Sequence, residues 1–127
     1  MLRILFVALA LISAVLPAQA VILTLSCEGT VELKSKGRTE PVPKMGVIVD
    51  LDAGTVTGFA GIIAQIEKFD ATMVLFGGDK ASFSVFGSLD RVTGATTATV
   101  IMYSRDRKEL LMNHTYSLIC KPTKPLF

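Results

Sequence analysis

The sequence predicts an all-β protein, a small antiparallel meander of about eight strands that closes into a barrel or a sandwich. Short segments of alternating apolar and polar residues recur along the chain, with turn residues between them. No window carries a persuasive helical period, and 61–69, the nearest candidate, also alternates as a strand does. The only two cysteines, Cys27 and Cys120, lie near opposite ends of the chain, each in phase with apolar neighbours.

The first twenty residues have the three parts of a secretory signal peptide. Arg3 supplies a positive charge, residues 4–16 form an apolar segment broken only by Ser13, and small residues follow. The apolar segment is shorter than the roughly 18–20 residues that a membrane-spanning helix needs. We therefore predict a signal peptide over 1–20, cleavage between Ala20 and Val21, a single β domain over 21–127 and no membrane span in the mature form.

The charge balance argues against a polyanionic partner. Of 13 basic residues, Arg3 lies in the predicted leader, which leaves 12 basic against 11 acidic residues. Nucleic-acid binding needs a basic stripe or patch, and the sequence shows none. We expect no nucleic-acid partner.

The strands are predicted in order from alternation and from the turn residues that separate them. Residues 35–44 are predicted as a loop because Gly37, Pro41 and Pro43 break strands. A tight hairpin is expected at 52–54, a glycine turn at 76–80, an Asp90–Gly94 turn and a charged hairpin end at 104–109. The candidate strands are 21–28, 29–35, 45–52, 55–61, 63–69, 72–77, 80–89, 95–104 and 110–120.

The two cysteines predict one intramolecular disulfide. Export places both thiols where disulfides persist, and two cysteines allow a single intramolecular pairing, which we favour over a free thiol pair or an intermolecular bond. Two cysteines and one histidine also fall short of a four-ligand zinc shell, so we expect no metal and no cofactor. Because Cys27 and Cys120 both point with apolar side chains, a bridge between them joins the first and last strands in one core.

Four segments carry a resemblance to a group of proteins. They are "LTLSCEGTV", "PVPKMGVIVDL", "GSLDRVTGA" and "YSLICKPTKPLF". Together they resemble short exported proteins of rhizobia and related alphaproteobacteria, a group that is usually left uncharacterised. The resemblance implies export and a small β fold, and it supplies no activity or catalytic residue.

The chain is also similar, more loosely, to the periplasmic inhibitors of C-type lysozyme. These are short exported barrels with one early and one late cysteine, and their inhibitory loop reads approximately Ser-Gly-Ser-Gly-x-x-Tyr. The nearest segments here, "FGSLDR" and "FGGDKASF", do not contain that loop. The likeness is therefore one of architecture.

The candidate chemical groups have ordinary explanations. His114 is the only histidine and points with the apolar side chains of its strand, so we expect a partly buried imidazole with one hydrogen bond rather than a base or metal ligand. Asp50 and Asp52 imitate the start of a calcium loop, but the position for its last ligand is Gly61, so turn capping explains them better. No catalytic residue is predicted.

A membrane-barrel interpretation is disfavoured by the polar residues at outward strand positions. Ser84, Ser88, Thr97 and Thr99 stand where lipid-facing apolar residues would be required. The most favoured function is a non-enzymatic binding or inhibitory module, periplasmic or secreted, that holds a small molecule or an envelope protein at a barrel mouth or at loops 35–44, 76–80 and 90–94. That hypothesis predicts an apolar pocket or a loop cluster with exposed Phe59, Phe76 or Phe86. A structural envelope protein without a discrete site is the alternative, and an enzyme is less favoured.

Overall fold

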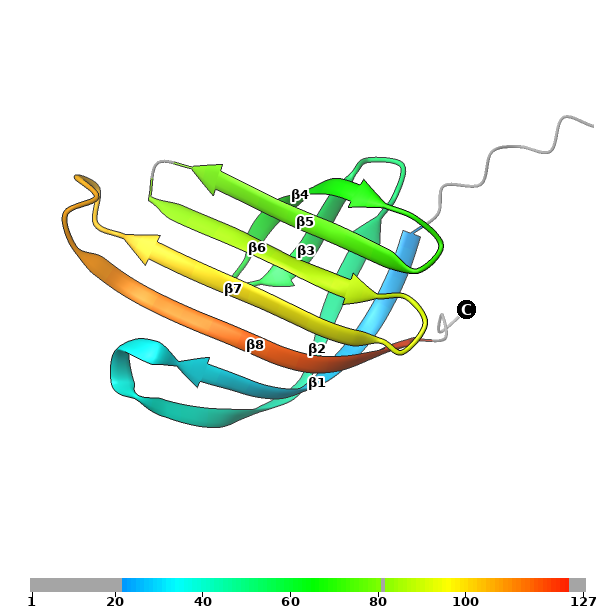
Figure 1. The fold of residues 1–127 in the computed structure, drawn as a ribbon, viewed down its shortest axis with the longest axis horizontal. Coiled ribbons are helices and arrows are strands. Elements are labelled where there is room, and N and C mark those ends of the chain that lie inside the picture. Colours follow the sequence, from blue (N-terminus) through cyan, green and yellow to red (C-terminus); the bar gives the residue numbers. More distant parts are fainter. Residues whose placement is uncertain (1–21, 81, 124–127) are drawn as a thin grey trace, which may run out of the picture.

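A computed structural model describes residues 22–80 and 82–123. The predicted signal peptide over 1–20 and the cleavage site at Ala20 and Val21 lie outside the described residues. Eight antiparallel strands follow one another around a closed barrel, each paired with its neighbours in the sequence, and the last pairs with the first (Figure 1). The strands are β1 (Ile22–Leu33), β2 (Arg38–Asp50), β3 (Thr55–Phe59), β4 (Ile62–Phe69), β5 (Met73–Lys80), β6 (Phe83–Asp90), β7 (Ala95–Tyr103) and β8 (Leu110–Pro122). The all-β prediction is confirmed, and the barrel is the form that the chain takes.

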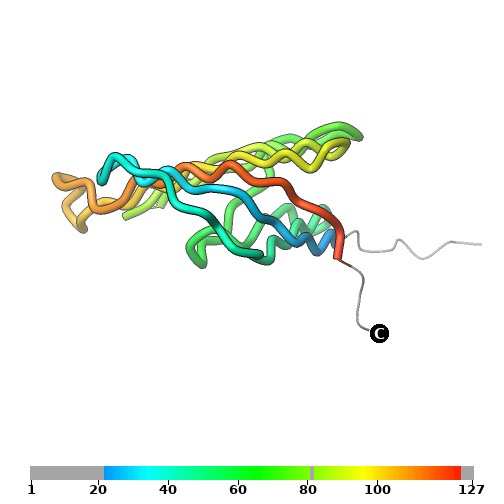
Figure 2. The backbone as a smooth tube through the Cα atoms, turned by 90° about the horizontal axis from the view of Figure 1, so that it is seen from below, coloured from blue at the N-terminus to red at the C-terminus, as the bar shows by residue number. Residues whose placement is uncertain are grey.

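The barrel is flattened, with β5–β7 on one side and β2–β4 on the other (Figure 2). β1 and β8 form one edge, where they pair along nine residues of each strand. By contrast, β2 and β3 pair over only three residues, from Ile48 to Asp50 and from Thr55 to Thr57. The long sheet from β5 through β8 to β1 therefore forms most of the wall, and β3 and β4 complete it.

The disulfide closes the barrel at the β1–β8 pair. Cys27 and Cys120 are Cα partners in the register of the two strands, 4.0 Å apart, and their sulfur atoms are bonded. Cys27 is fully buried, and Leu25, Val31 and Leu33 of β1 are buried on the same face. The predicted bridge and the predicted strand phase are both confirmed.

Residues 21–28 and 29–35 were predicted as two strands, and that prediction is wrong. β1 runs through Glu28 without a break because β8 pairs with it continuously from Leu25 to Leu33. The irregularity lies in β2, where the register moves from Cys27↔Met45 to Gly29↔Val42 and one extra residue of β2 bulges outward.

The predicted loop over 35–44 is also wrong. Only a short 3₁₀ turn, η1 (Lys34–Lys36), and Gly37 separate the strands, and β2 begins at Arg38. Pro41 and Pro43 are tolerated because this part of β2 pairs with β1 alone, and its other edge has no partner strand. Proline within a sheet is found on edge strands and at bulges, so prolines here do not break the strand.

The predicted turn at 76–80 lies inside β5, and the chain reverses after Lys80 instead. Gly77 and Gly78 do not have the positive φ that a glycine turn would use. The hairpin at 52–54, the turn at 90–94 and the charged hairpin end at 104–109 are confirmed, with Gly54 and Gly94 at φ of 70° and 80°. The strand prediction for 63–69 is confirmed as β4.

Candidate functional site

The barrel interior is filled by aromatic and branched side chains. Phe59 of β3 stacks on Phe76 of β5, with ring centroids 5.8 Å apart, and meets the edge of Tyr116 of β8 at 5.5 Å. Burial raises the pKa of the Tyr116 hydroxyl. Six valines belong to the same core cluster and are almost fully buried: Val47, Val49, Val56, Val74, Val85 and Val100. The hollows described next lie on the outer wall and at one end of the barrel.

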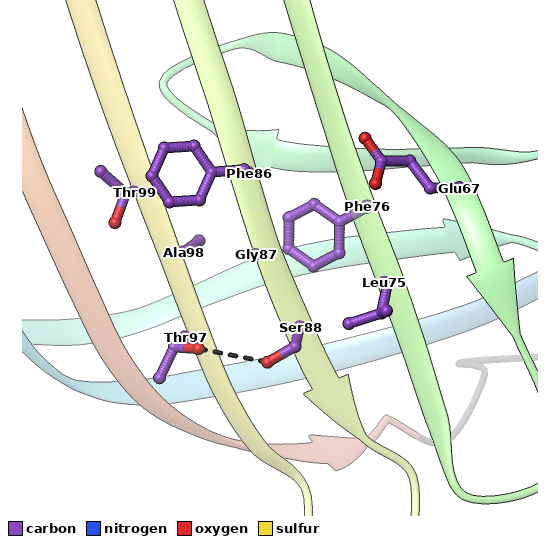
Figure 3. Close-up of a pocket in the computed structure, with 9 residues that line it drawn as sticks. All are labelled: Glu67, Leu75, Phe76, Phe86, Gly87, Ser88, Thr97, Ala98 and Thr99. Carbon is purple, nitrogen blue, oxygen red and sulfur yellow. Dashed lines mark hydrogen bonds between the residues drawn. The ribbon is translucent and has the colours of Figure 1, made fainter.

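The outer face of β5–β8 carries three adjoining depressions, which we call the outer groove. Their volumes are about 300, 480 and 270 Å³, and Thr97 lines all three. Ser88 lines two of them, so the hollow is centred on the β6–β7 pair. Figure 3 shows the first depression, with the Ser88 and Thr97 side chains side by side.

The groove exists because small side chains alternate outward along neighbouring strands. Ser88 and Thr97 are Cα partners, and their hydroxyls share a hydrogen bond of 3.3 Å. Thr99 and Thr115 form the equivalent pair between β7 and β8 at 3.2 Å. Each pair uses one hydrogen, which leaves further donor and acceptor capacity on hydroxyls that face outward.

One aromatic ring stands above this hydroxyl-rich surface. Phe86 is 53% exposed, and in the strand register it lies between Gly77 of β5 and Thr99 of β7. On the inner side the Phe76 ring packs against Gly87, where a Cβ would stand 2.6 Å from the ring. In Figure 3, Phe86 and Glu67 stand on either side of the Phe76 ring.

Glu67 brings a carboxylate to the β4–β5 side of the first depression. It is the extra residue of a bulge in β4, because Ile66 pairs with Phe76 and Lys68 pairs with Leu75. Its Oε1 lies 2.7 Å from the point where Gly77 would carry a Cβ, so the carboxylate occupies the space that the glycine leaves. Glu67 makes no hydrogen bond or ion pair with another described residue.

The charged residues that line the outer groove are all acidic. Glu67 lines the first depression, Asp90 the second and Glu28 the third, and no Lys, Arg or His lines any of them. Asp90 caps the turn that follows it, since its Oδ1 accepts hydrogen bonds from the N–H groups of Thr93 and Val92. These bonds hold the pKa of Asp90 below its usual value. The surface is therefore suited to neutral or cationic ligands.

A fourth hollow, of about 410 Å³, lies at the end of the barrel beneath the 90–94 turn. Leu23, Leu25 and Leu89 form an apolar lining, and Arg91 lies at the same end. The Arg91 side chain is already engaged, since Nη1 donates to the carbonyl of Asp70 in the β4–β5 turn. The Arg91 hydrogen bond thus links the 90–94 turn to the β4–β5 turn.

The residues singled out in the sequence are widely separated in the structure. His114 is half-buried on the inner face, with Leu33 and Val100 as its strand partners, and it lacks the expected hydrogen bond to any described residue. Asp50 caps the 52–54 turn as predicted, accepting from the N–H groups of Asp52 and Ala53.

Phe59 and Phe76, expected on the surface, are core residues, because their side chains point into the barrel and are at most 2% exposed. Only Phe86 of the three is exposed. Of the predicted surface loops, 90–94 borders two of the hollows, whereas 35–44 and 76–80 belong largely to strands.

Sequence reasoning missed Glu67 and the hydroxyl partner Thr115. The outward phase of Ser88, Thr97 and Thr99 was visible from alternation, but the bulge that turns Glu67 toward Gly77 has no local signal. Within 22–80 and 82–123 there is no group of three or more His, Cys, Asp or Glu able to hold a metal ion. The same residues contain no helix long and apolar enough to cross a membrane.

No family model, no curated protein and no solved structure matches the chain. The resemblance to the rhizobial group of exported proteins accordingly stays a prediction, as does the architectural likeness to lysozyme inhibitors.

Proposed function

We propose that this protein is a non-enzymatic binding module that holds a hydroxyl-rich glycan chain along the outer groove. The observation that carries the proposal is the meeting of three depressions at Thr97, on one exposed sheet face that also presents Phe86. The hollows are open and lie side by side. Such a surface suits a polymer that runs across it better than a small molecule enclosed on all sides.

The chemistry of the groove suits a sugar chain. The negative face of an aromatic ring attracts the weakly positive C–H bonds of a sugar ring, and Phe86 offers such a face. The hydroxyls of Ser88, Thr97 and Thr99 can both donate to and accept from sugar hydroxyls. The absence of Lys and Arg from the groove lining disfavours phosphate-rich ligands such as nucleic acid.

The arrangement of side chains in the groove favours a binding site over a catalytic one. Its carboxylates lie in three separate depressions, and the only histidine faces the barrel interior. The buried disulfide is compatible with an oxidising compartment. Together with the predicted leader, it supports a periplasmic or secreted location, where envelope glycans and envelope proteins are accessible.

The test is a titration of the ¹⁵N-labelled mature protein with soluble oligosaccharides. Binding is measured in two ways, from changes in the amide chemical shifts and from the temperature of thermal unfolding. We expect shifts on β5–β8 and a rise in apparent stability, because a ligand that binds the folded state stabilises it. Phe86→Ala should weaken binding about tenfold, which is the loss expected for one stacked aromatic ring.

Ile48→Ala is the matched control. Ile48 is 45% exposed on β2, on the other side of the barrel, and it lines none of the hollows described here. It should bind as the wild type does. If no glycan shifts the β5–β8 amides of the folded protein, the proposal is wrong and a structural envelope protein without a discrete site becomes the better account.

A further inference from the structure

We infer that Met102, Met112 and His114 form a binding site for one soft monovalent cation, Cu(I), on the inner face of the β7–β8 pair. The two cysteines are bonded to each other and are not free to bind a metal. Thioether and imidazole groups are therefore the soft donors that the described residues offer. The site lies on the face opposite the outer groove, so the inference does not rest on the proposed function.

Strand pairing brings the three donors together. Met102 of β7 and Met112 of β8 are Cα partners, and His114 follows Met112 by two positions on the same strand. Directly opposed residues on one face of an antiparallel pair have Cβ atoms about 4.5–5.5 Å apart, and diagonal neighbours lie about 7–8 Å apart. Residues two positions apart share a face and are separated by about 7 Å along the strand. One ion above this face is within reach of both thioethers and of the imidazole.

All three side chains belong to the inner face and keep part of their surface exposed. Met102 and Met112 are partly buried and pack against the core. His114 is half-buried, with Leu33 and Val100 as its strand partners. β7 and β8 extend beyond the β3–β4 turn at this end of the barrel (Figure 2). Because the donors are neither sealed in the core nor fully in water, an ion can enter and still lose part of its hydration.

The donor set favours a soft ion of low charge. Thioether sulfur is a neutral, polarizable donor that selects Cu(I), and imidazole also suits copper. The described residues contain no group of three or more His, Cys, Asp or Glu, so the donor sets typical of zinc and calcium are missing from this part of the chain. His114 makes no hydrogen bond with a described residue, so no such group competes for its ring nitrogens.

Two aromatic side chains border the donors. Phe83 of β6 is the Cα partner of Met102, and Tyr116 follows His114 by two positions on the same face. Both rings are partly buried and pack against the core. An aromatic ring next to a partly desolvated cation adds to the attraction for that cation. The surroundings of the three donors therefore favour the same ligand.

The experiment titrates the mature protein with Ag(I) in a buffer without chloride. Ag(I) shares the charge and softness of Cu(I) and needs no reductant, which would attack the disulfide. The methyl groups of ¹³C-labelled methionine and the His114 ring are followed by NMR. We expect saturation at a single Ag(I) ion per chain, with shifts of the Met102 and Met112 methyls. Met45, which pairs with Cys27, and Met73, at the start of β5, are internal references and should not shift.

Leucine substitutions separate metal binding from packing. Met102→Leu and Met112→Leu keep apolar side chains of similar volume, which cores tolerate well. Each should weaken Ag(I) binding at least about tenfold, because changes even outside the ligand shell cost about 10–100-fold at metal sites. His114→Leu should have an effect of the same size. Met73→Leu is the matched control and should bind as the wild type does.

A competition with Zn²⁺ tests the preference for a soft ion, and excess Zn²⁺ should leave the Ag(I) complex in place. Displacement by Zn²⁺, shifts of Met45 and Met73 equal to those of the two proposed ligands, or wild-type affinity in the Met102→Leu/Met112→Leu double variant would each overturn the inference. So would the absence of any methyl shift. None of these results bears on glycan binding at the outer groove, so the two proposals fail separately.

Discussion

Cys27 and Cys120 are directly opposite one another in the β1–β8 pair, with Cα atoms 4.0 Å apart and a sequence separation of 93 residues. The bridge therefore links the first and last strands at the seam where the barrel closes. Its two flanking pairs, Ser26↔Lys121 and Glu28↔Ile119, continue the same register on either side. The covalent link and the hydrogen-bonded ladder fix the same alignment.

Loss of the disulfide should destabilise the fold strongly. In the chain-entropy model, a bridge that closes so long a loop contributes about 4 kcal/mol to the free energy of unfolding. We expect the Cys27→Ser/Cys120→Ser double variant to lose about this amount in a urea titration. Wild type treated with reductant should give the same value. Alkylation of the unreduced monomer should modify no thiol, and two labelled thiols would contradict the bridge.

Gly29 should not tolerate a side chain, although it lies in the middle of a strand. A Cβ there would stand 2.1 Å from the carbonyl oxygen of Ser117, a backbone atom that cannot move away alone. We expect Gly29→Ala to cost about 2–4 kcal/mol of stability, as other severe overpacking changes do. Gly46→Ala is the control, because nothing lies within 4 Å of its added Cβ and its φ is not positive.

Gly46→Ala should raise the free energy of unfolding by at most about 1 kcal/mol, because alanine restricts the conformations of the unfolded chain. Equal effects of the two substitutions in chemical denaturation would show that the close approach of β1 and β8 at Gly29 is not as described.

The prolines of β2 should protect an open strand edge. Pro41 and Pro43 lie where β2 has no partner on its outer side among the described strands, and proline at a strand edge discourages pairing with a second chain. We expect Pro41→Thr/Pro43→Thr to increase self-association at high concentration without a large loss of monomer stability. Light scattering and gel filtration across a concentration series measure this, and an unchanged monomer would refute the protective role.

Acid should destabilise the protein through four aspartates that accept hydrogen bonds in the folded state. Hydrogen bonds lower the pKa of each of these carboxyl groups. Thr72 donates to Asp70, and Arg107 donates to Asp79. The Thr93 backbone donates to Asp90, and Ser104 donates to Asp106. Because each folded-state pKa lies below the unfolded value, the contribution to stability is complete above about pH 4 and declines as the pH falls further. Unfolding free energy measured against pH should show this decline.

Asp90→Asn should reduce the slope of that decline, because asparagine can still accept from the Val92 and Thr93 N–H groups but does not titrate. A variant with the same slope as the wild type below about pH 4 would exclude Asp90 as a contributor.

Alternation allowed the strand faces to be predicted, and it placed Cys27, Leu118 and Cys120 in the core and Ser88 and Thr97 outside. It could not distinguish Phe86 from Phe76, which are both aromatic residues in apolar strands. Only the register between β5 and β6 shows that one ring points outward beside Gly77 and the other inward under Gly87. The prolines of β2 were misinterpreted for a related reason, since their effect depends on whether a neighbouring strand needs the missing N–H.

By itself the sequence determined the all-β class, the turns at Gly54 and Gly94 and the cysteine pairing, because each depends on local periodicity, local backbone freedom or simple counting. The tertiary structure decided that the barrel interior is filled and that a hollow lies on the outer face of β5–β8. It also placed the Glu67 carboxylate over Gly77, in a depression that Phe86 lines as well. Those features depend on strand register and on a bulge in β4, and the pairing between neighbouring strands sets both of them, not the residue pattern of one strand.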